Sequence, residues 1–164
     1  MNRRLEESVS APGALTDLPC ACATARQVAR VLTQLYDGRL RETGVEAPQF
    51  ALMMTLEKQG PCSQVDLGRS YALDKTTVSR NLKLLERNGW ISSSEVSDKR
   101  KRQFTLTAAG RKRLAVAKPQ WKKAQNQLRS GMAAGQWDAM FRVFRTVVQA
   151  AQTLQKVDQK GEKS

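Results

Sequence analysis

The sequence predicts a mainly α-helical protein with one small β-hairpin. Apolar residues recur at helical spacing through most of the chain. Two short β-prone runs, WISSSEV and QFTLT, flank a charged turn, which is typical of a hairpin. Three helical segments separated by turn residues precede this hairpin. Their order over residues 48–107 predicts a winged helix-turn-helix, with a further helix before it and two after it.

The first predicted helix extends from about Cys20 to Arg41, where apolar residues recur at the helical period. Gly44 is a suitable stop for this helix. Pro48 is favoured in the first turn of a second helix, which ends at Gly60. These two segments lead into the helix-turn-helix.

Two short capped helices follow. Ser63 is the predicted N-cap of the segment QVDLGRS, and Asp74 is the predicted N-cap of Lys75–Asn88. Gly89 stands where a helix-terminating glycine is expected. The second of these helices is therefore the expected recognition helix.

The C-terminal part is predicted to be two helices. Thr107 caps the first, whose apolar residues have the spacing of a partner-helix seam. Pro119 lies inside it and is expected to kink or interrupt it. Gly131–Gly135 is a break before the last helix. The apolar stripe of that helix comprises Trp137, Met140, Phe141, Phe144, Val147, Val148, Ala151 and Leu154.

The outer helices have apolar faces too broad for a small wing domain to bury, so we expect them to bury one another and a second copy of the chain. The expected division is a flexible lead (1–17), an N-terminal dimerisation helix (18–47), a DNA-binding domain (48–107), C-terminal dimerisation helices (108–156) and a flexible tail (157–164).

Charge is unevenly distributed along the chain. The formal net charge of +13 divides into 0 for residues 1–60, +7 for residues 61–113 and +6 for residues 114–164. This pattern indicates a polyanionic partner, nucleic acid before anionic membrane. The chain has no apolar run long enough for a membrane span and no apolar signal-peptide core, so the expected compartment is the cytoplasm.

Several enzyme classes are disfavoured. The chain has no histidine, which removes the commonest general base and transition-metal ligand. It also has no Gly-rich phosphate loop, nucleophile elbow or paired Cys-x-x-Cys sites. We therefore expect a protein that is not an enzyme, with no cofactor and no metal site.

The expected recognition helix has two faces. At 100° per residue, Val78, Leu82 and Leu85 share its apolar edge. Cationic and hydroxyl side chains share another edge, which we name the basic arc. The basic arc comprises Lys75, Thr76, Ser79, Arg80, Lys83 and Arg87.

Such an arc suits duplex DNA. Hydroxyls near the helix N-terminus, on Thr76, Thr77 and Ser79, reach phosphates or base edges. Arg80 and Lys83 reach the backbone or guanine edges. Ser63 and Gln64 at the start of the preceding helix are further DNA-contact candidates.

The turn of the hairpin is cationic. Lys99, Arg100, Lys101 and Arg102 form a tip suited to a minor groove, where the negative potential attracts arginine. Asp98 is expected to brace Arg100. A basic arc alone is usually a solvated surface. The adjacent capped helix and cationic tip favour DNA binding.

These residues carry a family resemblance. The segments LDKTTVSRNLKLLERNGWI and DKRKRQFTLTAAG resemble the MarR family of bacterial transcription regulators, and the resemblance covers about residues 18–155. The family's wing pattern, Asp-x-Arg and then Leu-Thr-x-x-Gly, falls on Asp98, Arg100, Leu106, Thr107 and Gly110.

The resemblance implies a homodimer formed by the first and last helices. It implies a recognition helix in each of two major grooves of a pseudo-palindromic operator, with the wings in the flanking minor grooves. It further implies a transcriptional regulator, usually a repressor, released by a small molecule or an oxidant. The competing interpretation is a nonspecific nucleic-acid-binding protein associated with the nucleoid or the ribosome, which the net charge suits equally well.

Cys22 and Tyr36 stand 14 residues apart, about 21 Å along an unbroken helix. They cannot meet within one chain. Two copies that cross antiparallel at Ala29 bring Cys22 of one copy to Tyr36 of the other. This arrangement is similar to the organic-hydroperoxide-sensing branch of the MarR family, where oxidation of a first-helix cysteine near a partner-chain tyrosine releases DNA. The resemblance is partial, because two other tyrosines of that branch fall on Arg26 and Ala47.

The sequence leaves several interpretations open for the signal that releases the protein from DNA. Arg26, one turn from Cys22, favours a thiolate. Cys20 and Cys22 are alternatively small buried hydrophobes or ligands of a metal or metalloid. A small aromatic ligand is the other candidate trigger, and no role is assigned to Cys62. The candidate lining of a pocket for the aromatic ligand is Tyr36, Phe50, Met53, Met54 and Arg26.

Overall fold

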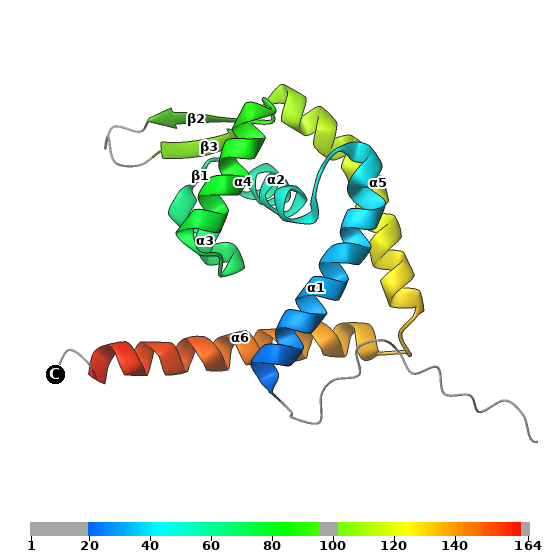
Figure 1. Cartoon of the computed structure of the whole chain (residues 1–164), viewed down its shortest axis with the longest axis vertical. Helices are drawn as coiled ribbons and strands as arrows, with labels where there is room; N and C mark the ends of the chain where they lie inside the picture. Colours follow the sequence, from blue (N-terminus) through cyan, green and yellow to red (C-terminus); the bar gives the residue numbers. More distant parts are fainter. Residues whose placement is uncertain (1–19, 96–101, 162–164) are drawn as a thin grey trace, which may run out of the picture. The chain divides into compact units, whose positions relative to one another are not determined.

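The computed structural model describes residues 20–95 and 102–161. These residues form a mainly α-helical fold with a small antiparallel sheet (Figure 1), which confirms the predicted fold class. The elements in chain order are α1 (Ala21–Leu40), η1 (Arg41–Thr43), α2 (Ala47–Gln59), β1 (Cys62–Ser63), α3 (Gln64–Tyr71), α4 (Lys75–Arg87), β2 (Ile91–Glu95), β3 (Arg102–Leu106), α5 (Ala108–Ser130) and α6 (Gln136–Gly161).

The chain divides into two compact units. The first ends at Ala117 and the second begins at Lys118, so the boundary lies inside α5. The first unit contains α1 to α4, the sheet and the first part of α5; the second contains the rest of α5 and α6. In the part of the chain that the structure describes, no helix is long and apolar enough to cross a membrane.

The link from α1 to α2 is held by side chains. Gly44 adopts a φ of +67° after η1, and glycine adopts this left-handed conformation without strain. The backbone N–H of Glu46 donates to Gln49 Oε1, and the Gln49 amide donates to the Glu46 carboxylate. Asp37 Oδ1 accepts from the N–H of Ala47 at 2.7 Å. The N-terminus of α2 is therefore tied both to its own first turn and to the end of α1.

The helix-turn-helix has the predicted caps. The Asp66 N–H donates to Ser63 Oγ at 3.2 Å, and the Thr77 N–H donates to Asp74 Oδ1 at 2.9 Å. Ala72 ends α3 in a left-handed conformation, with a φ of 50°. The turn between α3 and α4 is therefore short and fixed at both ends.

The sheet has three strands in the order β1–β3–β2, with both pairs antiparallel. Ile91 pairs with Leu106, and Glu95 pairs with Arg102. The hairpin of β2 and β3 was predicted. The third strand, β1, was not, because its two residues carry no recognisable β pattern of their own.

The core of the first unit is built from the apolar edges of its short helices and the inner face of the sheet. Its fully buried side chains come from several elements, and this burial is the main source of its stability. They include Leu40, Leu52, Met53, Leu67, Val78, Leu82, Leu85 and Leu114.

Pro119 was predicted to kink or interrupt its helix, and the structure contradicts the interruption. The helix α5 is continuous from Ala108 to Ser130 with Pro119 inside it. Proline removes one backbone donor and crowds the preceding turn, but flanking turns retain their own hydrogen bonds. The Thr107 hydroxyl accepts from the Gly110 N–H at 2.9 Å, as predicted for an N-cap.

The helix α6 follows the predicted break and extends to Gly161, beyond the boundary expected at residue 156. Its predicted apolar stripe includes large side chains with much exposed surface. Phe141, Phe144 and Val147 are 39%, 40% and 53% exposed, respectively, and Leu154 is 66% exposed. The second unit by itself therefore does not bury this stripe.

Candidate nucleic-acid interface

The helix α4 is amphipathic in the predicted sense. Val78, Leu82 and Leu85 are at most 1% exposed and hold the helix against the core. The Asn81 amide is also buried and donates to the Thr77 carbonyl at 2.9 Å. Most of the basic arc is exposed, and Ser79 is half-buried. The apolar edge therefore anchors the helix and leaves the basic arc accessible.

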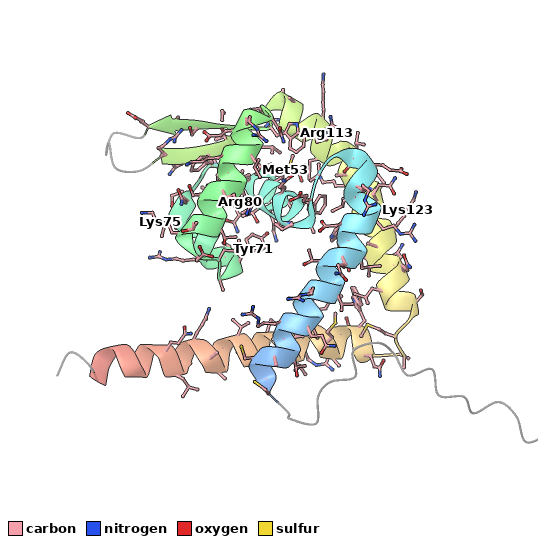
Figure 2. All side chains as sticks on the ribbon, viewed as in Figure 1. Met53, Tyr71, Lys75, Arg80, Arg113 and Lys123 are labelled. Atoms are coloured by element: carbon pink, nitrogen blue, oxygen red, sulfur yellow. The ribbon has the colours of Figure 1, made fainter. Side chains whose placement is uncertain are left out.

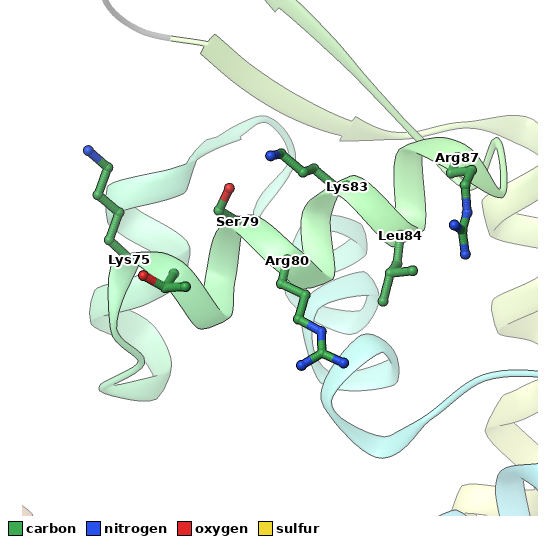
Figure 3. Close-up of a pocket in the computed structure, with 7 residues that line it drawn as sticks. Lys75, Ser79, Arg80, Lys83, Leu84 and Arg87 are labelled. Carbon is green, nitrogen blue, oxygen red and sulfur yellow. The ribbon is translucent and has the colours of Figure 1, made fainter.

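The basic arc lines an open hollow of about 520 Å³ on the surface of α4 (Figure 3). Four of its lining side chains are cations and none is acidic, so the local potential is positive. Figure 2 shows Lys75 and Arg80 on α4 among the other side chains. The lining residues are Lys75, Thr76, Ser79, Arg80, Lys83, Leu84 and Arg87.

The hydroxyls at the start of α4 have different roles. Thr76 is exposed, but the Thr77 hydroxyl donates to Asp74 Oδ2 at 2.5 Å. The hydrogen bonds from the Thr77 side chain and backbone hold the pKa of Asp74 below its ordinary value. Thr77 is thus part of the cap, while Thr76 and Ser79 belong to the accessible arc.

Ser63 and Gln64 connect the two helices of the helix-turn-helix. The Ser63 hydroxyl donates to Asp66 Oδ2 at 2.6 Å, in addition to its capping bond. The Gln64 amide donates to the carbonyl of Lys75 at 3.1 Å. Gln64 therefore fixes the start of α3 to the start of α4, and Lys75 keeps its ammonium group for other contacts.

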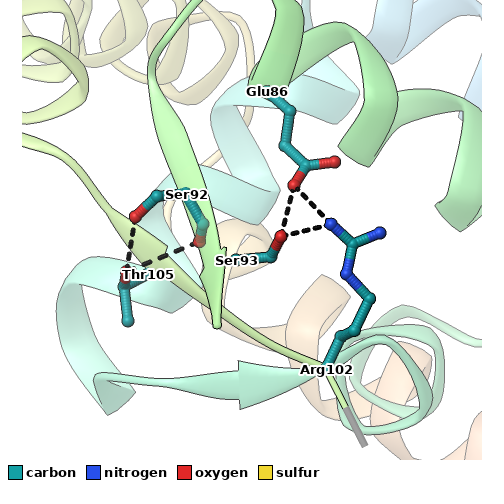
Figure 4. A network of polar contacts seen from close by, with 5 residues as sticks. All are labelled: Glu86, Ser92, Ser93, Arg102 and Thr105. Carbon is teal, nitrogen blue, oxygen red and sulfur yellow. Dashed lines mark hydrogen bonds and ion pairs between the residues drawn. The ribbon is translucent and has the colours of Figure 1, made fainter. Parts of the chain in front are cut away.

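Part of the predicted hairpin tip lies outside the described residues, namely Asp98, Lys99, Arg100 and Lys101. Arg102 is described, and it is the first residue of β3 rather than part of a turn. Its guanidinium lies 3.2 Å from Glu86 Oε1 and also donates to the Ser93 hydroxyl (Figure 4). Arg102 pairs with Glu95 in the last described pair of the β2–β3 ladder, at the opposite end from the Ile91–Leu106 pair.

Sequence reasoning missed Glu86 and Ser93 in this cluster. Strand alternation was the available signal, because Arg102, Phe104 and Leu106 occupy alternate positions and so share one face of the sheet. Phe104 and Leu106 are buried, which makes this the inner face. An arginine at the end of an inner face can pair with an acid on the element packed against that face, and Glu86 in the last turn of α4 is such an acid.

The predicted sensing residues lie along α1. Cys20 is the N-cap of this helix, and Cys20, Cys22 and Arg26 are exposed. Tyr36 is half-buried, and this burial raises its pKa above 10.0. Because α1 is unbroken from Ala21 to Leu40, Cys22 and Tyr36 lie far apart on the same helix. Cys20 and Cys22 are therefore not part of the core of the first unit.

Cys62 has a different environment. It is 6% exposed, and its thiol donates to the Gly60 carbonyl at 3.4 Å. Burial, followed by the nearby charge of Asp66, raises its pKa and so disfavours the reactive thiolate. Among the described residues, no group of three or more Cys, Asp or Glu side chains is arranged to hold a metal ion.

The candidate pocket residues Phe50 and Met53 are buried in the core of the first unit, and Met54 is half-buried. They come from α2, which packs between the sheet and the other helices of this unit. Core packing accounts for Phe50 and Met53 without a ligand.

Comparisons with known proteins agree with this geometry. A family model described as the MarR family matches residues 45–101. The chain is 25% identical over 123 residues to YwoH of Bacillus subtilis (strain 168), described as an uncharacterized HTH-type transcriptional regulator, and the match covers 75% of this chain and 90% of that protein.

Two solved structures are also similar. The first is the Mycobacterium tuberculosis transcriptional regulator MosR in complex with DNA, with a TM-score of 0.74, 31% identity and coverage of 82% of this chain and 97% of that one. The second is reduced AbfR bound to DNA, with a TM-score of 0.67, 25% identity and coverage of 81% and 91%, respectively. Both proteins were solved on DNA.

Proposed function

The chain belongs to the MarR family and is a DNA-binding transcriptional regulator, and from this premise we propose that it acts as a homodimeric, sequence-specific repressor in the cytoplasm. The exposed basic arc of α4 is the observation that carries the proposal. It combines four cations with two hydroxyls on one edge of a helix whose opposite edge is buried. This is the chemistry that contacts phosphates and base edges in a major groove.

We propose a role for each protein side chain that contacts the DNA. Lys75, Arg80, Lys83 and Arg87 supply charge to the duplex, and Thr76 and Ser79 supply short hydrogen-bonding groups. Arg100 and its cationic neighbours Lys99 and Lys101 are proposed to enter the flanking minor groove. Asp98 is proposed to brace Arg100.

The exposed stripe of α6 supports the homodimer. Contiguous apolar surface of this kind is uncommon on a monomeric soluble protein and marks a protein–protein interface. A twofold dimer would place two copies of α4 on two half-sites, so the proposed operator is a pseudo-palindrome with half-sites about one helical turn apart.

Two release signals are proposed, and the exposed position of Cys22 favours oxidation. An accessible thiol is open to attack by a peroxide. The similarity to AbfR, a protein solved in a reduced, DNA-bound state, is consistent with a redox-controlled relative. A small aromatic ligand beside Tyr36 is the second candidate signal.

Competition binding tests the regulator proposal. A duplex selected from a random pool should bind far more tightly than a scrambled duplex of equal length. Both affinities should fall with salt because phosphate contacts release counterions. Equal affinity for the two duplexes would favour the nonspecific alternative and contradict the proposal.

Peroxide titration of the DNA complex tests the signal. The wild-type protein should release DNA on oxidation, and Cys22→Ser should bind DNA normally but resist release. Cys62→Ser is the control, because a buried thiol should not affect the response. If peroxide leaves the wild-type complex intact, the ligand proposal remains and the oxidation proposal is abandoned.

A further inference from the structure

Side chains from three elements fasten the β2–β3 hairpin to the last turn of α4 (Figure 4). Arg102 of β3 donates to the Ser93 hydroxyl of β2, and Ser93 Oγ donates to Glu86 Oε1 of α4 at 2.7 Å. Arg102 also contacts the same carboxylate oxygen directly at 3.2 Å. One oxygen of Glu86 thus holds both strands of the hairpin.

The orientation of Arg102 supports this role. The guanidinium lies 5.7 Å from the centroid of the Phe104 ring, on the inner face of the sheet. The Phe104 ring is buried beneath it. The Arg102 side chain is therefore directed along the inner face toward α4, where Glu86 is 27% exposed and accessible to it.

We propose that Glu86 is a positioning residue for DNA binding, which acts through Arg102 and Ser93 to hold the strands of the hairpin in a fixed place relative to α4. This proposal rests on the proposed function. A protein that places a helix and a hairpin on one duplex must hold both at the correct separation, and any freedom between them is lost on binding at a cost in affinity. In this arrangement Arg102 is a brace and not a phosphate contact.

Glu86→Gln removes a negative charge, so electrostatics and the positioning role predict opposite changes in DNA affinity. Neutralising an acid close to DNA strengthens binding by electrostatics alone. The brace predicts the opposite, so Glu86→Gln should weaken specific binding by about tenfold. Glu95→Gln is the matched control. It removes the same charge from β2, opposite Arg102 in the register, and should leave affinity unchanged or raise it.

The salt dependence of binding distinguishes a brace from a phosphate contact. Arg102→Gln should weaken binding but leave the slope of log affinity against log salt at the wild-type value. Lys83→Gln, on the basic arc, should reduce that slope by about one. The Glu86→Gln/Arg102→Gln double variant should bind no more weakly than the weaker single variant, because both substitutions remove one interaction.

The outcomes separate this inference from the proposed function. If the wild type fails to prefer its selected duplex, or Lys83→Gln changes nothing, the proposed function fails. If Lys83→Gln behaves as expected but Glu86→Gln retains or gains affinity, the brace alone is wrong. A reduced salt slope for Arg102→Gln, a loss for Glu95→Gln equal to that for Glu86→Gln, or a large fall in the unfolding temperature of Glu86→Gln would also overturn it.

Discussion

Gly110 lies where the first turn of α5 packs closely against the backbone of Trp90. The first turn of α5 passes the carbonyl of Trp90, which accepts from the Thr107 N–H at 3.0 Å. The Thr107 hydroxyl also donates to the Gly89 carbonyl at 2.7 Å. A Cβ atom at Gly110 would lie 1.9 Å from the Trp90 oxygen. Only glycine therefore allows α5 to begin against the backbone of Trp90, directly before β2.

Gly110→Ala should lower the free energy of unfolding by about 2 kcal/mol or more, because the obstruction is backbone and cannot rotate away. Denaturant unfolding measures this change. Gly38→Ala is the control, since nothing lies within 4 Å of its Cβ position in α1. That helical substitution should be neutral or stabilising, and an equal loss at both positions would contradict the packing argument.

The N-cap Asp74 makes the stability of the start of α4 depend on pH. Its pKa is lowered in the folded state from 3.8, so the ionised cap stabilises the fold above that value and the contribution is lost as pH falls through the folded pKa. Asp74→Ala should lower the unfolding temperature at neutral pH.

The difference in unfolding temperature between wild type and Asp74→Ala should shrink as the pH is lowered below 3.8, the ordinary pKa of this carboxyl. Thermal unfolding across this range measures it. Asp74→Asn caps the helix without titrating at this position and serves as the control. If the difference in unfolding temperature between wild type and Asp74→Ala stays constant with pH, this role of Asp74 is excluded.

At the scale of the element, α4 combines stability and binding on opposite edges. Leu82 is 1% exposed and belongs to the core, whereas Arg80 is exposed on the basic arc. The helix N-cap and the C-terminal Gly89, with a φ of +69°, determine where this amphipathic segment begins and ends. Substitutions on its two edges should therefore have separable effects.

Arg80→Ala should weaken operator binding by about 1–3 kcal/mol, the range for an arginine that contacts a base, with little change in unfolding temperature. Fluorescence anisotropy with the selected duplex measures the loss. Arg129→Ala removes the same charge from an exposed position of α5. Should both variants lose affinity equally, net charge and not the basic arc would explain binding.

At the scale of the molecule, most of the large exposed apolar side chains among the described residues lie on α6. Phe141 and Phe144 are each about two-fifths exposed, and Val148 is 51% exposed. The Trp137 and Phe141 rings pack edge to face, with centroids 5.2 Å apart. Only another surface can bury the rest of this stripe, and the proposed second copy would do so.

Phe144→Glu should shift the protein from dimer to monomer, because a carboxylate would be buried in the apolar interface without a partner. Sedimentation velocity measures the shift, and binding to the palindromic operator should fall with it. Gln149→Glu adds a charge to the opposite side of α6 and should leave the dimer intact. A wild-type protein that is monomeric at binding concentrations would refute the assembly.

The local features of this fold were predictable from the sequence. Ser63, Asp74 and Thr107 are caps because each satisfies a backbone donor three residues away. The basic arc follows from 3.6 residues per turn. The hairpin follows from two β-prone runs around a charged turn. Each of these inferences needs only residues that are neighbours in the chain.

The remaining features depend on residues distant in the chain. The strand β1 exists only because Cys62 pairs with Phe104. Arg102, predicted as part of the tip, is the first residue of β3, and its contact with Glu86, 16 residues away, was not predicted. The sequence by itself determined which helices form, where they are capped and which edge is cationic. Tertiary structure decided the third strand and the inward direction of Arg102, because pairing and burial depend on distant side chains that only the folded chain brings together.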